Sequence, residues 1–92
     1  MPAVIDNAAR SRFELDVEGE TAFAEYRLSP GVMIFTHTLT PRALRGRGIA
    51  GQVVHAALEH ARADGLKVVP QCWYVAQYIQ QHPEFADLLE QR

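Results

Sequence analysis

The spacing of apolar residues changes once along this chain, and that change constrains the fold more than any other feature. Apolar and polar residues alternate over 12–17 and again over 21–28, as in half-buried strands. The run 32–40 begins apolar on both faces, which predicts a strand covered on both sides. From residue 49 to about 64 the apolar residues recur every three to four positions, which predicts an amphipathic helix. The chain is therefore expected to begin as a sheet and to continue with a helix.

The remaining segments complete a mixed sheet. Short turns join the first three strands, so we expect an antiparallel meander. The apolar run 66–70 after the helix predicts a short buried strand, and a right-handed crossover makes it parallel to the third strand. We expect a helix over about 73–80, a break before Pro83 and a last short helix over 84–89. The sequence thus predicts an α/β fold: a mixed sheet of about four strands, one main helix and two short C-terminal helices.

Length and charge limit the functions that the chain can serve. Its 92 residues suffice for one domain, 1–92, and its 9 basic and 11 acidic side chains give a net charge of -2 at pH 7. This balance argues against a surface dedicated to nucleic acid. The single cysteine, Cys72, excludes an internal disulfide and a zinc site made of cysteine pairs. No apolar stretch has the length of a signal peptide or of a membrane span, so we expect a soluble, cytoplasmic protein without a membrane partner.

The segment 45–51, with the sequence RGRGIAG, is the most informative motif. The first backbone N–H groups of a helix lack intrahelical partners and carry the positive end of the helix dipole. Glycines let an anion approach the main chain, and two arginines add positive charge, so the segment predicts a phosphate site. The alternative is a plain tight turn before a helix. The glycines also match the dinucleotide fingerprint G-x-G-x-x-G, but an antiparallel meander precedes them, so we do not expect nicotinamide binding.

The stretch Arg45-x-x-Gly48-x-Ala50 resembles the pyrophosphate-binding signature of the GCN5-related N-acetyltransferases, Q/R-x-x-G-x-G/A. The run 34–85 is similar to the small YjdJ-type branch of that superfamily, which is about this long and lacks the extra helices that usually build the acceptor site. The Arg-Gly loop, the KVVP-x-C segment and the YI-x-x-HPEF segment carry the resemblance, which covers roughly residues 5–90. It implies an N-acetyltransferase that binds acetyl-CoA and transfers the acetyl group to a small amine or a protein amine.

The resemblance also implies which residues hold coenzyme A. Backbone N–H groups of the loop would hold the pyrophosphate, and the end of the third strand would pair with the pantetheine arm. A cleft for this arm requires the fourth strand to splay from the third, which is compatible with prolines at both strand ends. The expected cofactor-binding residues are Thr38, Leu39, Thr40, Arg45, Gly46, Arg47, Gly48, Ile49, Ala50 and Gly51.

Cys72 is the first of three candidate catalytic residues. It stands between a strand and a helix start, where the helix dipole can lower the pKa of a thiol, so we expect it to be partly exposed and reactive. The resemblance matches it to a cysteine suspected of acting as an acyl carrier or as a neighbour of the thioester. The alternative is a small buried hydrophobic residue.

Tyr78 and His37 are the other two candidates. Members of the superfamily often keep a tyrosine in the helix of Tyr78 to protonate the leaving thiolate; the alternative, which the residue type favours, is an aromatic ring packed in the core with its hydroxyl in solvent. Tyr74, one turn earlier, shares its helix face. Regular alternation places His37 on the strand face of Phe35 and Leu39, as a base in the cleft or as a hydrogen-bonded structural histidine. The branch commonly has a Glu where this chain has Leu39, so an acidic base is not expected there.

Other aromatic and histidine residues are assigned to structure. We expect the rings of Trp73 and Phe85 to pack over the sheet, and His82 to belong to a helix break. His55 and His60 are five residues apart on one helix and do not face each other, so no metal site is expected and both should be solvated.

Two other functions are compatible with the sequence. One is a module that binds coenzyme A without transferring an acyl group. The other is a small interaction protein whose loop binds the phosphate of a partner.

Overall fold

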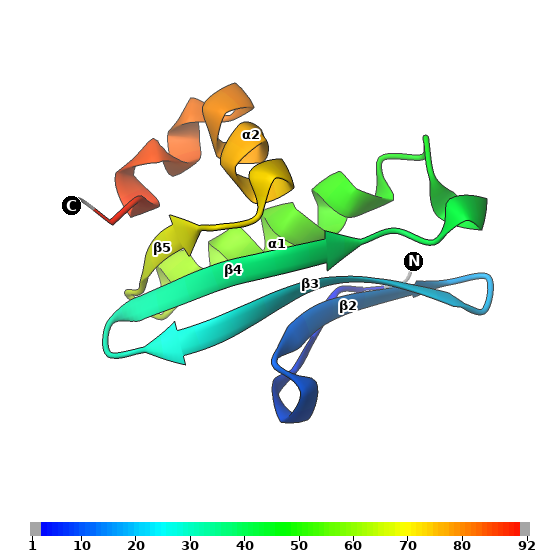
Figure 1. The fold of residues 1–92 in the computed structure, drawn as a ribbon, viewed down its shortest axis with the longest axis horizontal. Coiled ribbons are helices and arrows are strands. Elements are labelled where there is room, and N and C mark those ends of the chain that lie inside the picture. The colour runs from blue at the N-terminus through cyan, green and yellow to red at the C-terminus, as the bar shows by residue number, and fades with distance from the viewer. Residues whose placement is uncertain (1–2, 91–92) are drawn as a thin grey trace.

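One sheet of five strands forms the frame of residues 3–90, the part of the chain described by a computed structural model (Figure 1). The strands are β1 (Ile5–Asn7), β2 (Arg12–Val17), β3 (Glu20–Ser29), β4 (Val32–Leu39) and β5 (Lys67–Pro70). The helices are α1 (Ile49–Ala63) and α2 (Trp73–Gln81), with 3-10 helices η1 (Ala8–Arg10), η2 (Arg42–Leu44) and η3 (Pro83–Leu88). Among residues 3–90, no helix is both long and apolar enough to cross a membrane.

The strands lie in sequence order across the sheet, with antiparallel pairing from β1 to β4 and a parallel pair of β4 and β5. This confirms the mixed α/β sheet, the meander and the crossover through α1. The sheet has one strand more than expected, β1. The sequence did not predict this strand, because it has only three residues and they show no hydrophobic period. The last short helix is a 3-10 helix, and Leu89 beyond it forms a parallel bridge to Val68 on the outer edge of β5.

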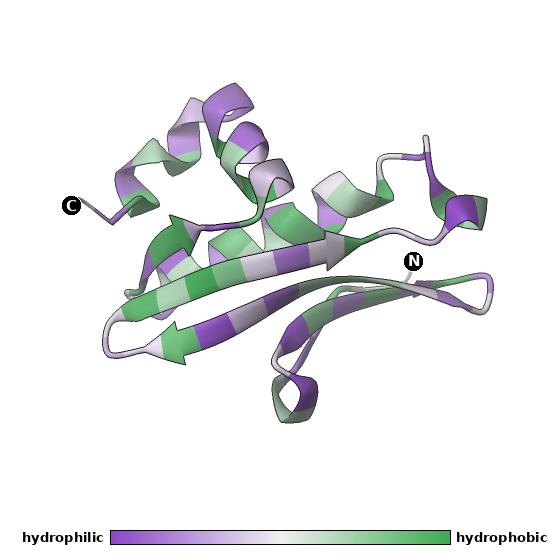
Figure 2. Cartoon of the chain, in the orientation of Figure 1, coloured by the Kyte–Doolittle hydropathy of each residue, from purple (hydrophilic) through white to green (hydrophobic). Residues whose placement is uncertain are grey.

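Both main helices cover the same face of the sheet, since α1 packs against β2 and β3 and also contacts α2 and η3. Along most of β2 and β3 and along the first half of β4, every second residue points to this face and is buried. Figure 2 shows that β4 is hydrophobic in its first half and more mixed toward its end. The strand residues of the core are Phe13, Leu15, Ala22, Ala24, Tyr26, Met33, Phe35 and Val68. Phe85 joins them, fully buried, as expected.

Trp73 does not pack over the sheet, and that expectation was wrong. Its side chain is 74% exposed. Val75 and Ile79, four residues apart on one face of α2, take the inward positions of the helix and are buried. Trp73 therefore begins α2 on a face directed away from the core.

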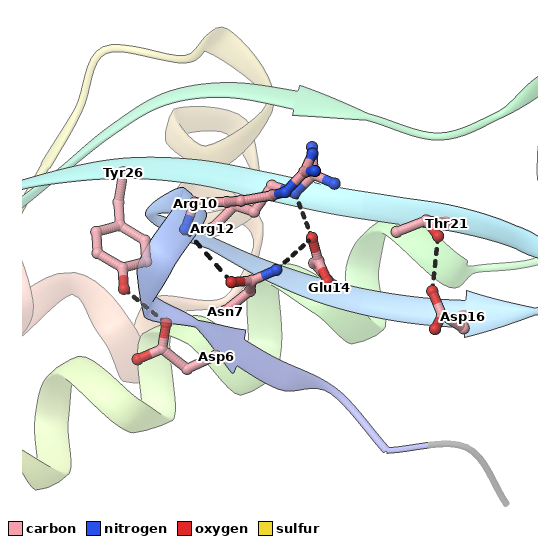
Figure 3. Close-up of polar contacts among 8 residues, drawn as sticks. All are labelled: Asp6, Asn7, Arg10, Arg12, Glu14, Asp16, Thr21 and Tyr26. Atoms are coloured by element: carbon pink, nitrogen blue, oxygen red, sulfur yellow. Dashed lines mark hydrogen bonds and ion pairs between the residues drawn. The ribbon is translucent and has the colours of Figure 1, made fainter.

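A polar network fastens β1 to the next two strands (Figure 3). The buried Tyr26 donates a hydrogen bond from its hydroxyl to Asp6 in β1, at 2.6 Å. Burial and the nearby carboxylate raise the pKa of Tyr26 to about 12. Asn7 donates to Glu14, which also pairs with Arg12. These contacts hold a strand that is too short to be stabilised by backbone pairing alone.

Candidate functional site

The alternation of buried and exposed residues along β4 shifts by one position part-way along the strand. Tyr26 of β3 pairs with Phe35 and Glu25 pairs with His37, which leaves Thr36 as one extra residue in β4. Such a β-bulge shifts the alternation of the strand by one position. Before the bulge Phe35 faces the core, and after it Thr38 lies opposite the buried Ala24 on that same face.

The bulge places His37 on the opposite, uncovered face of the sheet. Its ring stands edge-on to Phe23, with centroids 6.3 Å apart, and Leu39 pairs with Phe23 on the same side. The expectation that His37 shares a face with Phe35 was wrong, because it assumed strict alternation through Thr36.

β4 and β5 separate at the bulge, as expected for a cleft. Their parallel pairing ends at Phe35 and Pro70, while β4 continues to Leu39. The backbone N–H of Cys72 then donates to the carbonyl of Phe35, at 2.9 Å, and the chain turns into α2. In residues 3–90 no strand pairs with β4 beyond Phe35 on the β5 side. The edge 36–39 is therefore available for backbone hydrogen bonds with a ligand.

Cys72 lies at the inner end of this gap. It is the N-cap residue of α2, and its Sγ atom is 3.6 Å from the hydroxyl of Thr38. Only 7% of Cys72 is exposed, so in its exposure it matches the alternative of a small buried residue and not that of a partly exposed thiol. The bulge accounts for the burial in part, because it turns Thr38 rather than His37 toward the sulfur.

The segment 45–48 forms a tight turn that leads directly into α1. Gly46 and Gly48 both have positive φ, and Gly48 is the N-cap residue in the left-handed conformation. No side chain caps this helix start and its first turn carries no acidic residue. A Cβ atom on Gly48 would meet nothing within 4 Å, so the surroundings are open. This uncapped helix start fits an anion such as the pyrophosphate of coenzyme A.

The two arginines of the loop have protein partners. Arg45 donates from Nε to the carbonyl of Thr40, at 3.0 Å. Arg47 donates from both Nη atoms to the carboxylate of Glu18, at 2.8 and 3.2 Å, and the pair lowers the pKa of Glu18. Sequence reasoning missed Glu18, because it lies in the β2–β3 turn, 29 positions before Arg47, and no local pattern links the two.

Two tyrosines of α2 pack against the first turns of α1. A Cβ atom on Gly51 would lie 3.7 Å from the Tyr74 hydroxyl oxygen and 3.7 Å from ring carbon Cε2 of Tyr78. The Tyr78 hydroxyl forms a hydrogen bond with Nδ1 of His55, at 3.2 Å. Burial raises the pKa of both tyrosines, and Glu84 raises that of Tyr78 further. Tyr74, one turn before the candidate Tyr78, thus brings its hydroxyl to the start of α1.

The remaining histidines have local partners. His82 stacks on Tyr78, with centroids 3.9 Å apart, and donates from Nδ1 to the Tyr78 carbonyl. His60 lies 3.0 Å from Asp64 and 3.8 Å from Asp6, so it is not simply solvated. Within the described part of the chain, no three His, Cys, Asp or Glu residues are grouped to hold a metal ion.

Comparison with known proteins gives the family. A family model described as GCN5-related N-acetyl-transferase matches residues 12–88, which include the bulge, the loop, α1 and α2. The chain belongs to the GCN5-related N-acetyltransferase family.

The chain is also similar to Protein NATD1 of several vertebrates. It is 43% identical over 47 residues to the proteins of Gallus gallus and Homo sapiens, and 36% identical over 47 residues to that of Danio rerio. Each alignment covers 51% of this chain and 42 or 43% of the relative. The chain thus spans less than half the length of the curated relatives it matches.

Proposed function

We propose that this chain binds acetyl-CoA and transfers its acetyl group to an amine. One observation carries the proposal: β4 loses its β5 partner at Phe35, and its free edge leads, through 40–48, to the uncapped start of α1. A ligand with an extended amide-bearing arm that ends in a pyrophosphate needs a free strand edge for the amides and, next to it, a helix start for the phosphates. Membership of the acetyltransferase family supports acetyl-CoA as that ligand.

The chain's own backbone would supply most of the binding. N–H groups at the start of α1 would hold the pyrophosphate, with glycines at 46 and 48 allowing close approach. Backbone groups of residues 36–39, together with Thr40, would pair with the amides of the pantetheine arm, as an added strand does. The Arg45 side chain, held against Thr40, would add positive charge beside both sites.

The thioester would then lie near Cys72 and Thr38. In the transfer, the lone pair of a neutral amine attacks the thioester carbonyl carbon, a C–N bond forms and the C–S bond breaks. The amine nitrogen loses a proton to solvent, and coenzyme A leaves as a thiolate that takes up a proton. Tyr74 and Tyr78 would keep their protons at neutral pH, because the ordinary pKa of tyrosine is 10.0 and burial raises the pKa of each above that value, so either can serve as the donor.

We assign Cys72 to the wall of the thioester site rather than to the role of acyl carrier. A nucleophilic thiol must be ionised and accessible, whereas Cys72 is 7% exposed. We expect its alkylation by iodoacetamide to be slower than that of free cysteine, and Cys72→Ala to retain transfer. Intact mass after incubation with acetyl-CoA tests the alternative. A stable acetyl adduct on the wild type, with loss of transfer in Cys72→Ala, would make Cys72 the carrier.

Ligand-induced stabilisation tests the cofactor. A ligand selective for the folded state adds about 2.7 kcal/mol to the free energy of unfolding at one hundred times its Kd. Coenzyme A and acetyl-CoA should therefore raise the thermal midpoint, and NADH should not. If millimolar coenzyme A leaves the midpoint unchanged, the cofactor assignment is wrong. Binding without transfer to any amine would leave a coenzyme A-binding module.

A further inference from the structure

Trp73 is exposed at a place where packing does not require a large aromatic residue. It is the single tryptophan of the chain and the most exposed of its described large hydrophobic side chains, at 74%. The other solvent-facing positions of α2 are small or polar: Ala76, Gln77, Gln80 and Gln81. An isolated exposed apolar residue is common on protein surfaces, so position has to decide whether this one has a role.

The position of Trp73 is fixed next to the gap between β4 and β5. It follows Cys72, whose N–H is bonded to Phe35 at the point where the strands part. As the first residue of α2, it has a backbone held by the helix. Its ring stands edge-on to Tyr74, with centroids 5.9 Å apart, and Tyr74 in turn reaches the start of α1. The exposed indole is thus attached to the backbone directly beside the gap, one residue after Cys72.

Thr38 and Cys72 meet at the inner end of this gap, and neither side chain carries a negative charge. An amine acceptor arrives largely as an ammonium ion, and neither of these two residues gives it a carboxylate partner. The face of an indole attracts cations more strongly than any other side-chain ring. Trp73 is therefore suited to hold an alkylammonium group, or the methylene chain that carries it.

We propose that Trp73 binds the acceptor, and that the acceptor is a primary alkylammonium compound on a flexible chain. This rests on the proposed function, and it adds the substrate class and the residue that recognises it. Two sources share this chemistry, the side chain of lysine in a peptide and a free polyamine.

The fluorescence of the protein tests this directly, because Trp73 is its single tryptophan. The full chain, saturated with coenzyme A, is titrated with a blocked pentapeptide Gly-Gly-Lys-Gly-Gly, with the same peptide carrying norleucine for lysine, and with spermidine. We expect a saturable change of emission with the lysine peptide, with spermidine or with both, and none with the norleucine peptide at equal ionic strength. The compound that changes the emission at the lower concentration, lysine peptide or spermidine, identifies the source of the amine.

Two substitutions separate the ring from simple hydrophobicity. Trp73→Leu keeps an apolar side chain and a good helix former but removes the aromatic face. It should raise the KM for the responding amine about five- to tenfold and leave the KM for acetyl-CoA unchanged, whereas Trp73→Phe should have a smaller effect. Leu28→Ala is the matched control, because Leu28 is also exposed, at 63%, but lies beside the β3–β4 turn, at the opposite end of β4.

Three results would overturn the inference. Emission that responds to coenzyme A alone and to no amine would place Trp73 in the cofactor site. An unchanged amine KM in Trp73→Leu would remove it from acceptor binding, and an equal response to the norleucine peptide would show that the contact is only apolar. Failure of the proposed function is distinct, since the wild type would then show no thermal shift with coenzyme A, or a shift without acetyl transfer to any amine.

Discussion

Glu18 holds both terminal nitrogens of Arg47, at 2.8 and 3.2 Å, and so ties the β2–β3 turn to the loop that begins α1. Glu18 itself has positive φ in that turn, next to Gly19. Both side chains are substantially exposed. The carboxylate therefore offsets one of the two arginines beside the proposed pyrophosphate site.

We expect Glu18→Gln to increase affinity for coenzyme A, because it frees Arg47 to face the phosphates. The gain should be about two- to fivefold at low ionic strength, as expected for an exposed pair, and should vanish near 1 M salt, where the screening length is about 3 Å. Calorimetric titration at both salt concentrations measures it. Glu20→Gln, which removes a charge from the same hairpin without touching Arg47, is the control. Weaker binding in Glu18→Gln would instead mean that Glu18 positions Arg47 for the ligand.

Gly48→Ala should reduce both stability and coenzyme A binding. Gly48 has φ of 73°, so a Cβ atom costs roughly 1–2 kcal/mol of folding free energy. Gly31→Ala is a matched control, since Gly31 has the same φ and equally open surroundings but lies in the β3–β4 turn. Urea unfolding should show similar losses for both variants, while titration should show weaker binding only for Gly48→Ala. Equal affinities would place the phosphates elsewhere.

Gly51→Ala should stabilise the protein. Gly51 lies inside α1, where alanine is favoured over glycine by up to about 1 kcal/mol. The added methyl would meet Tyr74 and Tyr78 at 3.7 Å, which is ordinary contact distance. A higher urea midpoint with an unchanged slope is the expected result. A lower midpoint would indicate that the two tyrosine rings pack more closely on α1 than these distances allow.

Tyr26 should make the protein sensitive to alkali. Its pKa is about 12 in the folded state, against an ordinary value of 10.0, so the folded state holds the phenol proton more tightly than the unfolded state does. The resulting stabilisation is complete below pH 10 and is lost as the pH rises from about 10 to 12, in total roughly 2–3 kcal/mol. Unfolding free energies between about pH 9 and 12, compared with those of Tyr26→Phe, isolate this residue from Tyr74 and Tyr78. Parallel curves for the two proteins would contradict the assignment.

The hydrophobic pattern was sufficient to predict the sheet and the main helix, because burial of one face imposes its period on the sequence. It correctly predicted β2 at 12–17 and the start of α1 at Ile49. It missed β1, which is held by side-chain contacts such as Tyr26–Asp6 rather than by a pattern.

The candidate site was less predictable than the fold. The loop was recognisable because its chemistry is contained in consecutive residues. The bulge at Thr36 was not, since a single extra residue leaves the local composition unchanged and yet reverses the side of His37. A local sequence pattern does not show which residues meet in three dimensions. It therefore predicted neither the pairing of Arg47 with Glu18 nor the exposure of Trp73.

The extra residue in β4 divides one continuous strand into two parts with different structural roles. Up to Phe35 the strand is an internal member of the sheet, bonded on both edges, and substitutions there are constrained by the core. Beyond Thr36 only the β3 edge is paired within the described residues, so the backbone of the second part keeps one edge for another partner. A small domain can in this way keep a fixed scaffold and an unpaired binding edge on the same stretch of backbone. One inserted amino acid separates the two parts.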